Sequence, residues 1–180
     1  KMVYLANPDN PMGSWHSADT VQDLIDAMPD TTLLVLDEAY VELAPAGTAP
    51  VLRPETGNVI RMRTFSKAYG MAGARVGYAI GPKSLISAFD KLRNHFGMSR
   101  ISQAGALAAL ADQDYFNSVV ENVAQSRRQI IEIAEINGLS ALPSAANFVA
   151  VDCGRGGDFA RAVLSHMVAN GIFIRMPAIA

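Results

Sequence analysis

The chain has 180 residues, of which half are hydrophobic and 18% are charged, so a sizeable packed core is expected. Its net charge is −2, and the lack of a basic excess argues against nucleic acid and anionic membranes as partners. The single cysteine, Cys153, excludes an internal disulfide and fits a reducing compartment, so we expect a cytoplasmic protein. The apolar runs are too short to cross a bilayer.

Most of the chain alternates short apolar runs with helical patterns. The apolar runs are bounded by turn residues and are typical of parallel strands that are covered on both faces; they span residues 2–6, 33–36, 59–62 and 76–80. Apolar residues at helical spacing follow these runs in the segments 17–28, 82–92, 102–111 and 114–136. This alternation predicts an α/β fold with a mainly parallel sheet and flanking helices.

The organisation changes after Gly138, which would end the long helix. A strand at 147–152, a helix at 157–170 and a strand at 172–175 are predicted to follow. We place a domain boundary along the long helix. Residues 1–130 are expected to form the C-terminal part of a large domain, and residues 131–180 the start of a smaller, incomplete α+β domain. Because strand patterns lie at both ends, we expect the sequence to be a fragment of a longer protein.

Two polar segments directly follow predicted strands, which is where α/β proteins form ligand sites. The segment 7–13, Asn-Pro-Asp-Asn-Pro-Met-Gly, contains Asn10 and forms a rigid turn. The segment 37–40, Asp-Glu-Ala-Tyr, places acids at the end of a buried strand, where a carboxylate needs a partner. Taken alone, each segment is also compatible with an ordinary loop or a solvated acid.

A third polar segment, 64–75, surrounds Lys67 and follows the strand predicted at 59–62. A lysine near strand ends can lose its charge by desolvation and become nucleophilic. The neighbouring Ser66 and the later Arg75 are donors suited to phosphate oxygens. The alternative is a surface lysine in a flexible loop, which is the usual place of a lysine.

Together and in this order, the three segments resemble the aminotransferase class I and II family, the fold type I enzymes that use pyridoxal 5′-phosphate (PLP). The patterns are Asn-Pro-x-Asn-Pro-x-Gly, Asp-Glu-Ala-Tyr and Ser-Lys-x-x-Gly-x-x-Gly-x-Arg. The resemblance implies that Lys67 holds the cofactor as a Schiff base and then moves the substrate's α-proton. It implies that Asp37 pairs with the pyridine nitrogen and keeps it protonated.

The same resemblance assigns the remaining cofactor contacts. Asn10 and Tyr40 would hydrogen-bond the phenolic oxygen of the cofactor, and Ser66 and Arg75 would hold its phosphate. Tyr40 would also take part in catalysis with Lys67 and Asp37. The histidines do not cluster with acids at metal spacing, so no metal is expected.

Within the family, the segments 92–97, 103–110 and 144–148 are similar to histidinol-phosphate aminotransferases. Tyr40 favours transamination, because related acyltransferases usually carry histidine there. The resemblance implies a homodimer that transfers an amino group between an amino acid and a 2-oxo acid or a phosphorylated keto substrate. Asn147 and Arg175 would contact the substrate, although an exposed arginine at a strand edge is equally compatible with the position of Arg175.

Two other functions share these patterns. One is a different reaction on the same cofactor, such as that of a threonine-phosphate decarboxylase, a C–S lyase or an acyltransferase. The other is a PLP-binding regulator that uses the fold as a sensor. If the protein is an enzyme, whether an aminotransferase or another PLP enzyme, we expect the 180 residues alone to have little activity. Part of the family's site lies outside these residues.

Overall fold

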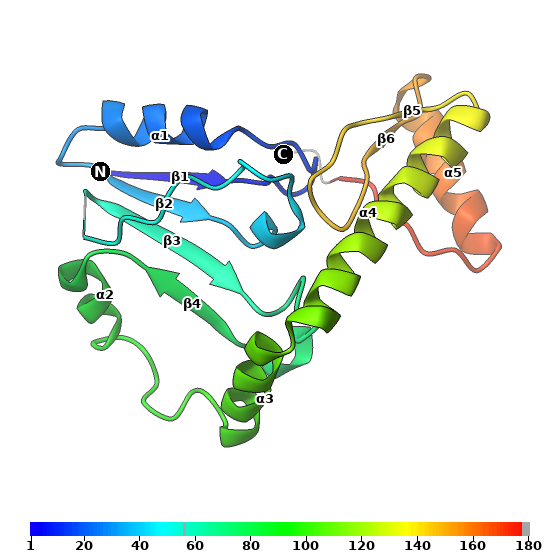
Figure 1. Ribbon diagram of the computed structural model, residues 1–180. Helices are drawn as coiled ribbons and strands as arrows, with labels where there is room; N and C mark the ends of the chain where they lie inside the picture. The colour runs from blue at the N-terminus through cyan, green and yellow to red at the C-terminus, as the bar shows by residue number, and fades with distance from the viewer. Residues whose placement is uncertain (56, 178–180) are drawn as a thin grey trace.

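The computed structural model describes residues 1–55 and 57–177, and its centre is a four-stranded sheet in the order β1-β2-β3-β4 (Figure 1). The strands are β1 (Met2–Ala6), β2 (Leu33–Asp37), β3 (Val59–Thr64) and β4 (Gly77–Ile80). β1, β2 and β3 are parallel, and β4 runs antiparallel to β3. The predicted mainly parallel α/β sheet is therefore present.

Helix α1 (Ala18–Ala27) covers one face of this sheet. It begins where predicted, because the Ser17 side chain accepts a hydrogen bond from Thr20 N at 3.2 Å. Val21 packs against Leu34 and Leu36, and all three side chains are at most 1% exposed. Because side chains alternate along β2, Asp37 lies on the opposite face from these leucines.

The later helices are α2 (Lys83–Phe89), α3 (Arg100–Ala111) and α4 (Gln113–Ile136), and two 3₁₀ turns, η1 (Val41–Leu43) and η2 (Ala72–Ala74), precede them. α3 and α4 pack beyond the carboxyl ends of β2 and β3, whereas α2 follows β4 at the opposite edge of the sheet (Figure 1). Residues of α4 contact Tyr40 and Leu43, and Ala106 of α3 contacts Phe65. These contacts position the two loops that carry the predicted site residues.

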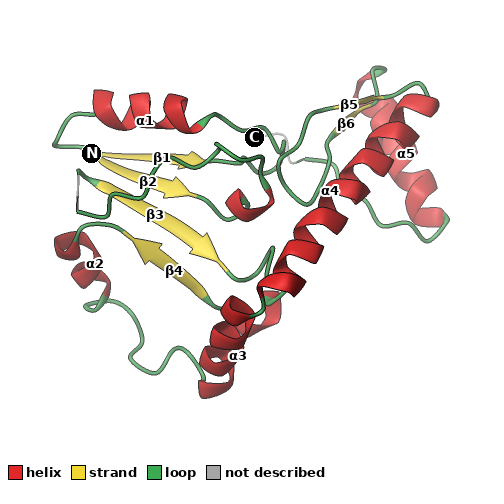
Figure 2. Cartoon of the chain, viewed as in Figure 1, coloured by secondary structure: helices red, strands yellow, loops and turns green. Residues whose placement is uncertain are grey.

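Helix α4 leads away from the large sheet to a small second layer (Figure 2). This part contains β5 (Ser140–Ala141), β6 (Val151–Asp152) and α5 (Gly156–Ala169), and β5 and β6 pair antiparallel. Gly138, at φ +70°, follows the end of α4, and Leu139 N donates to Ala134 O at 2.9 Å. A glycine is suited to this left-handed position. Within the described residues, no helix is long and apolar enough to cross a membrane.

Three kinds of sequence expectation differ from the structure: the strands after Gly138, the direction of β4 and the length of one helix. The strand predicted at 147–152 is shortened to β6, and residues 172–175 form no strand, because no described strand pairs with them. The chain makes no helical crossover between β3 and β4, so β4 returns antiparallel. The helix predicted over 82–92 ends at Phe89.

The fourth difference concerns burial, because the described residues do not cover both faces of the sheet. On β1, Met2 and Tyr4 lie on the face away from α1 and are 67% and 62% exposed. Helices α3 and α4 pack on the segments beyond the carboxyl ends of β2 and β3 and not over β1 (Figure 1). The apolar residues of β1 therefore correctly predicted a strand. The expectation that both faces of this strand are buried is wrong for the described residues.

Candidate active site

The three polar segments identified in the sequence meet at one edge of the sheet. β1, β2 and β3 are parallel, so their carboxyl ends lie side by side. Backbone hydrogen bonds continue the pairing beyond the strands: Asn7 N donates to Asp37 O at 2.9 Å, and Glu38 N donates to Met62 O at 2.9 Å. This edge also borders a cleft of about 540 Å³ whose lining includes Tyr4, Asn10, Asp37 and Tyr40.

Three of the predicted residues form a compact group at the cleft. Asn10 Nδ2 donates a hydrogen bond to the Tyr40 hydroxyl at 3.2 Å, and Lys67 Nζ lies 4.9 Å from the centre of the Tyr40 ring. Tyr40 is only 6% exposed, and its ring stands edge-on against Phe148 with the centroids 5.4 Å apart. A rigid aromatic side chain therefore separates an amide donor from a half-buried amine.

Asp37 lies in the same cleft and has a donor on each carboxylate oxygen. Oδ1 accepts from Ala39 N at 2.9 Å, and Oδ2 accepts from the Tyr4 hydroxyl at 2.6 Å. The hydrogen bond to Asp37, followed by burial, raises the pKa of Tyr4 to about 12. The two hydrogen bonds therefore hold the carboxylate in one orientation at the cleft.

Ser66 and Arg75 are less directly placed. The Ser66 hydroxyl accepts from Thr64 Oγ1 at 2.9 Å, and neither Ser66 nor Arg75 lines the cleft. Arg75 is exposed, donates from Nη1 to Ala72 O at 2.9 Å, and adopts left-handed backbone angles with φ 55°. A non-glycine residue in this region is uncommon, and such conformations concentrate at functional sites.

The two predicted substrate residues, Asn147 and Arg175, are exposed and do not line the cleft. The segment around Asn147 nevertheless touches the Asn-Pro turn, because Ala145 N donates to Gly13 O at 2.9 Å. Arg175 lies in the extended end of the described chain.

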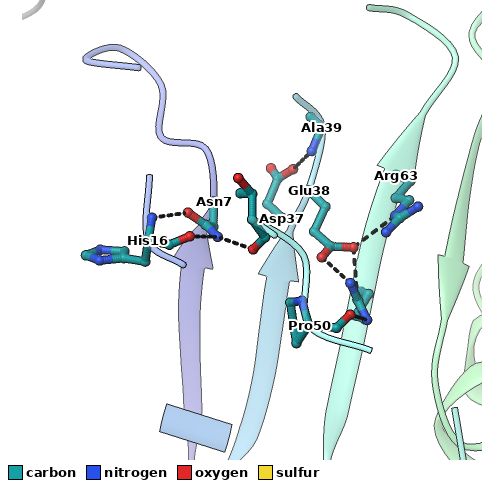
Figure 3. A network of polar contacts seen from close by, with 9 residues as sticks. Asn7, His16, Asp37, Glu38, Ala39, Pro50 and Arg63 are labelled. Atoms are coloured by element: carbon teal, nitrogen blue, oxygen red, sulfur yellow. Dashed lines mark hydrogen bonds and ion pairs between the residues drawn. The ribbon is translucent and has the colours of Figure 1, made fainter. Parts of the chain in front are cut away.

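Asn7 is an anchoring residue whose side-chain role the sequence did not reveal. It is 2% exposed, and its Oδ1 accepts from His16 N at 2.8 Å while its Nδ2 donates to His16 O at 3.2 Å (Figure 3). The pattern identified Asn7 as part of a turn. The structure shows why asparagine suits this position: its side chain makes two hydrogen bonds to the backbone of His16. These hydrogen bonds close the loop that carries Asn10.

Glu38 forms a buried ion-pair network beside the cleft. It is 1% exposed, and its carboxylate accepts from both Arg61 and Arg63, the latter at 2.9 Å. Figure 3 shows Glu38 turned toward Arg63, while the Asp37 carboxylate lies beside the backbone of Ala39. The sequence feature that could have predicted this network is the pair Arg61 and Arg63 in an otherwise apolar strand. Positions i and i+2 of a strand share a face, so both arginines can reach one acid.

Glu42 is a second buried acid near this network. Neither of its carboxylate oxygens has a hydrogen-bond partner among the described residues. Burial raises its pKa, and Arg63 partly opposes that effect. Within residues 1–55 and 57–177, no three His, Cys, Asp or Glu side chains are grouped so as to hold a metal ion.

Arg127 connects α4 to two loops at the site. Its Nη1 donates to Leu43 O at 3.0 Å and to Ala146 O at 2.9 Å. One guanidinium therefore holds the segment after Tyr40 and the segment before Asn147 against the same helix. No local sequence pattern indicates this contact, because the partners of Arg127 are backbone atoms distant along the chain.

The mainly parallel sheet and the loops at its carboxyl edge, which place Asp37 and Tyr40 in one cleft and Lys67 beside the Tyr40 ring, define a protein of the fold type I class. The chain belongs to the aminotransferase class I and II family, whose model matches residues 1–176. This match and the structural likeness below confirm both the predicted family and the predicted fold class.

The most similar proteins include several that are named histidinol-phosphate aminotransferases. The protein from Geobacillus sp. (strain WCH70) is 38% identical over 179 residues, which cover 97% of this chain and 48% of that protein. The protein from Bacillus pumilus (strain SAFR-032) is 43% identical over 161 residues, which cover 88% of this chain and 44% of that protein.

Among solved structures, histidinol-phosphate aminotransferase from Sinorhizobium meliloti in complex with pyridoxal-5′-phosphate superposes with a TM-score of 0.93 and 57% identity. That superposition covers 99% of this chain and 50% of that chain. The chain thus spans about half the length of the relatives it matches.

Proposed function

We propose that the full-length protein is a PLP-dependent aminotransferase whose amino donor is histidinol phosphate and whose acceptor is a 2-oxo acid. The observation that carries the proposal is the position of Lys67 Nζ, 4.9 Å from the ring of Tyr40, which lines the same cleft as Asp37. The relatives named above support the choice of substrate.

The residues at the sheet edge fit PLP. The cofactor carries an aldehyde, a basic ring nitrogen, a phenolic oxygen and a phosphate, and the site offers an amine, a carboxylate, an amide–hydroxyl pair and a serine with an arginine. Lys67 would bind the aldehyde carbon, and Asp37 the ring nitrogen. Asn10 and Tyr40 would bind the phenolic oxygen, and Ser66 and Arg75 the phosphate. When bound, PLP supplies an electron sink for the pair of electrons left at the substrate's Cα.

The chain's own contribution to catalysis is proton transfer and electrostatics. Lys67 would be the base that removes the α-proton of the substrate and holds it for return. The Asp37 carboxylate, whose oxygens accept from Tyr4 and Ala39, would pair with the ring nitrogen and favour its cationic form. The Tyr40 hydroxyl, with Asn10 as its donor, orients a proton toward the phenolic oxygen.

The remaining expectations are part of the same proposal. Asn147 and Arg175 would contact the substrate, and a homodimer in the cytoplasm is the working assembly. Residues 1–130 form the C-terminal part of the PLP-binding domain, and residues 131–180 the start of the small domain. This division is supported by α4, whose first half packs on Tyr40 while its last turns contact β5.

The test is product analysis with the full-length protein. L-Histidinol phosphate and 2-oxoglutarate are expected to give glutamate and the corresponding ketone phosphate, and Lys67→Ala is expected to abolish turnover. Phenylalanine and aspartate serve as competing donors. Release of CO₂ from threonine phosphate without glutamate formation, or PLP binding without turnover of any donor, would instead identify a decarboxylase or a regulator.

A further inference from the structure

We propose that Tyr4 is a positioning residue of this site, whose hydroxyl holds the Asp37 carboxylate in the orientation that pairs with the ring nitrogen of PLP. The contact is a hydrogen bond of 2.6 Å from the Tyr4 hydroxyl to Asp37 Oδ2. This inference rests on the proposed function and adds a residue that the motif patterns do not contain.

The parallel register of β1 and β2 produces this contact. Ala6 lies opposite Asp37, and Tyr4 lies opposite Val35, so Tyr4, Ala6 and Asp37 share one face of the sheet. Ala6 presents only a methyl group, which leaves room for the phenol ring to extend along the strand toward the carboxylate. Tyr4, Ala6 and Asp37 all line the cleft.

Two donors restrain the carboxylate more than one would. The Ala39 N–H holds Oδ1 and the Tyr4 hydroxyl holds Oδ2, so rotation about the Cβ–Cγ bond would break two hydrogen bonds instead of one. Each carboxylate oxygen accepts about two hydrogen bonds, so lone pairs remain for a third donor from the cleft. The arrangement therefore leaves the Asp37 carboxylate oriented and still able to accept the ring N–H.

The Tyr4 hydroxyl remains a donor over the whole working pH range. Its pKa is raised to about 12, first by the hydrogen bond to Asp37. Below that pH the phenol is protonated, so it donates rather than repels the carboxylate. Because the Tyr4 side chain is 62% exposed in this chain, loss of its hydroxyl is not expected to disturb the core.

The experiment compares Tyr4→Phe with Tyr115→Phe in the full-length, PLP-loaded protein. Tyr115 lies on α4, is 63% exposed, and its hydroxyl has no hydrogen bond among the described residues, so it is a matched control. A hydrogen bond to a charged group corresponds to roughly tenfold or more in an equilibrium. We expect Tyr4→Phe to lower kcat about tenfold with little change in KM, and Tyr115→Phe to change neither.

A spectroscopic readout separates positioning from a structural role. A cationic ring nitrogen lowers the proton affinity of the lysine–cofactor linkage, so weaker pairing with Asp37 raises the pH midpoint of its visible absorption band. We expect Tyr4→Phe to raise this midpoint by about half a unit or more. The free energy of unfolding is expected to stay unchanged. An unshifted midpoint in Tyr4→Phe would overturn the inference.

A double-mutant cycle tests whether Tyr4 acts through Asp37. In an Asp37→Asn background, Tyr4→Phe is expected to add no further shift of the midpoint, whereas an equal shift in both backgrounds contradicts the proposed route. The wild-type spectrum distinguishes failure of the proposed function from failure of this inference. If no absorption band linked to Lys67 forms, the proposed function is wrong. If the band forms but its pH midpoint is the same in Tyr4→Phe, only this inference is wrong.

Discussion

Asp37 and Glu38 are adjacent acids with different surroundings. Asp37 faces the cleft and accepts from Tyr4 and a backbone N–H, whereas Glu38 is 1% exposed and accepts from Arg61 and Arg63. The requirement that an acid at a buried strand end be partnered is met at both positions. Side-chain alternation sends one carboxylate to the candidate site and the other into a structural network.

Asp37→Ala in the full-length protein is expected to damage catalysis more than cofactor binding. Loss of the carboxylate removes the charge that favours a cationic ring nitrogen, while the phosphate contacts proposed for Ser66 and Arg75 remain. We expect kcat to fall about a hundredfold or more, and the Kd of PLP to rise by about tenfold or less. Steady-state kinetics and cofactor titration measure the two effects, and equal losses would contradict the assigned role.

Glu42→Gln is expected to stabilise the full-length protein at neutral pH. The pKa of Glu42 is raised by burial, so the folded state resists ionisation more than the unfolded state does. The free energy of unfolding of the wild type therefore falls as pH rises above the ordinary glutamate pKa, and the loss is complete above the raised pKa. The neutral variant avoids this loss.

We expect the Glu42→Gln variant to be more stable by about 1 kcal/mol at pH 7 and to match the wild type near pH 4. Urea unfolding at both pH values measures the difference. A wild type that is more stable at pH 7 would mean that the carboxylate has a charged or hydrogen-bonding partner in the complete protein.

At the scale of elements, the sequence predicted what local patterns determine. The helix expected over 114–136 is Gln113–Ile136, because its apolar spacing and its flanking residues act within a few turns. The direction of β4 and the absence of a strand at 172–175 were not predictable, because strand pairing depends on distant neighbours. The same holds for Tyr4, whose contact with Asp37 follows from the register of two strands.

The junction between the Asn-Pro turn and the later segment is an element contact that a glycine permits. Gly13 has φ +80°, and a Cβ there would lie 2.3 Å from Ser144 Oγ and 2.8 Å from Ser144 Cβ. Gly47 has a similar φ of +82°, but a Cβ there would meet nothing within 4 Å. The two glycines therefore share a backbone requirement and differ in packing.

Gly13→Ala is expected to destabilise the full-length protein more than Gly47→Ala. Both variants carry the cost of alanine in a left-handed conformation, roughly 1–2 kcal/mol, and only Gly13→Ala adds overpacking of about 1–3 kcal/mol. Denaturant unfolding of both variants gives the difference. Equal losses would show that Ser144 does not contact the turn so closely in the complete protein.

At the scale of the whole molecule, the chain carries the amine and the acid of the candidate site but only half the length of its relatives. The exposed face of β1 and the cleft border the same residue, Tyr4. Composition and motifs predicted the class of protein, because the three polar segments follow consecutive parallel strands. They did not predict which face of the sheet is buried, because burial depends on segments that are distant along the chain. We expect the 180 residues alone to turn over far more slowly than the full-length protein.

The most direct test of the central claim is the site of covalent attachment of PLP. The PLP-loaded full-length protein is reduced with borohydride, digested and mapped by mass spectrometry, with Lys1, Lys83 and Lys91 as internal controls. We expect loss of the visible band and a stable pyridoxyl adduct on Lys67. An adduct on a different lysine, or a loaded protein that forms none, would contradict it.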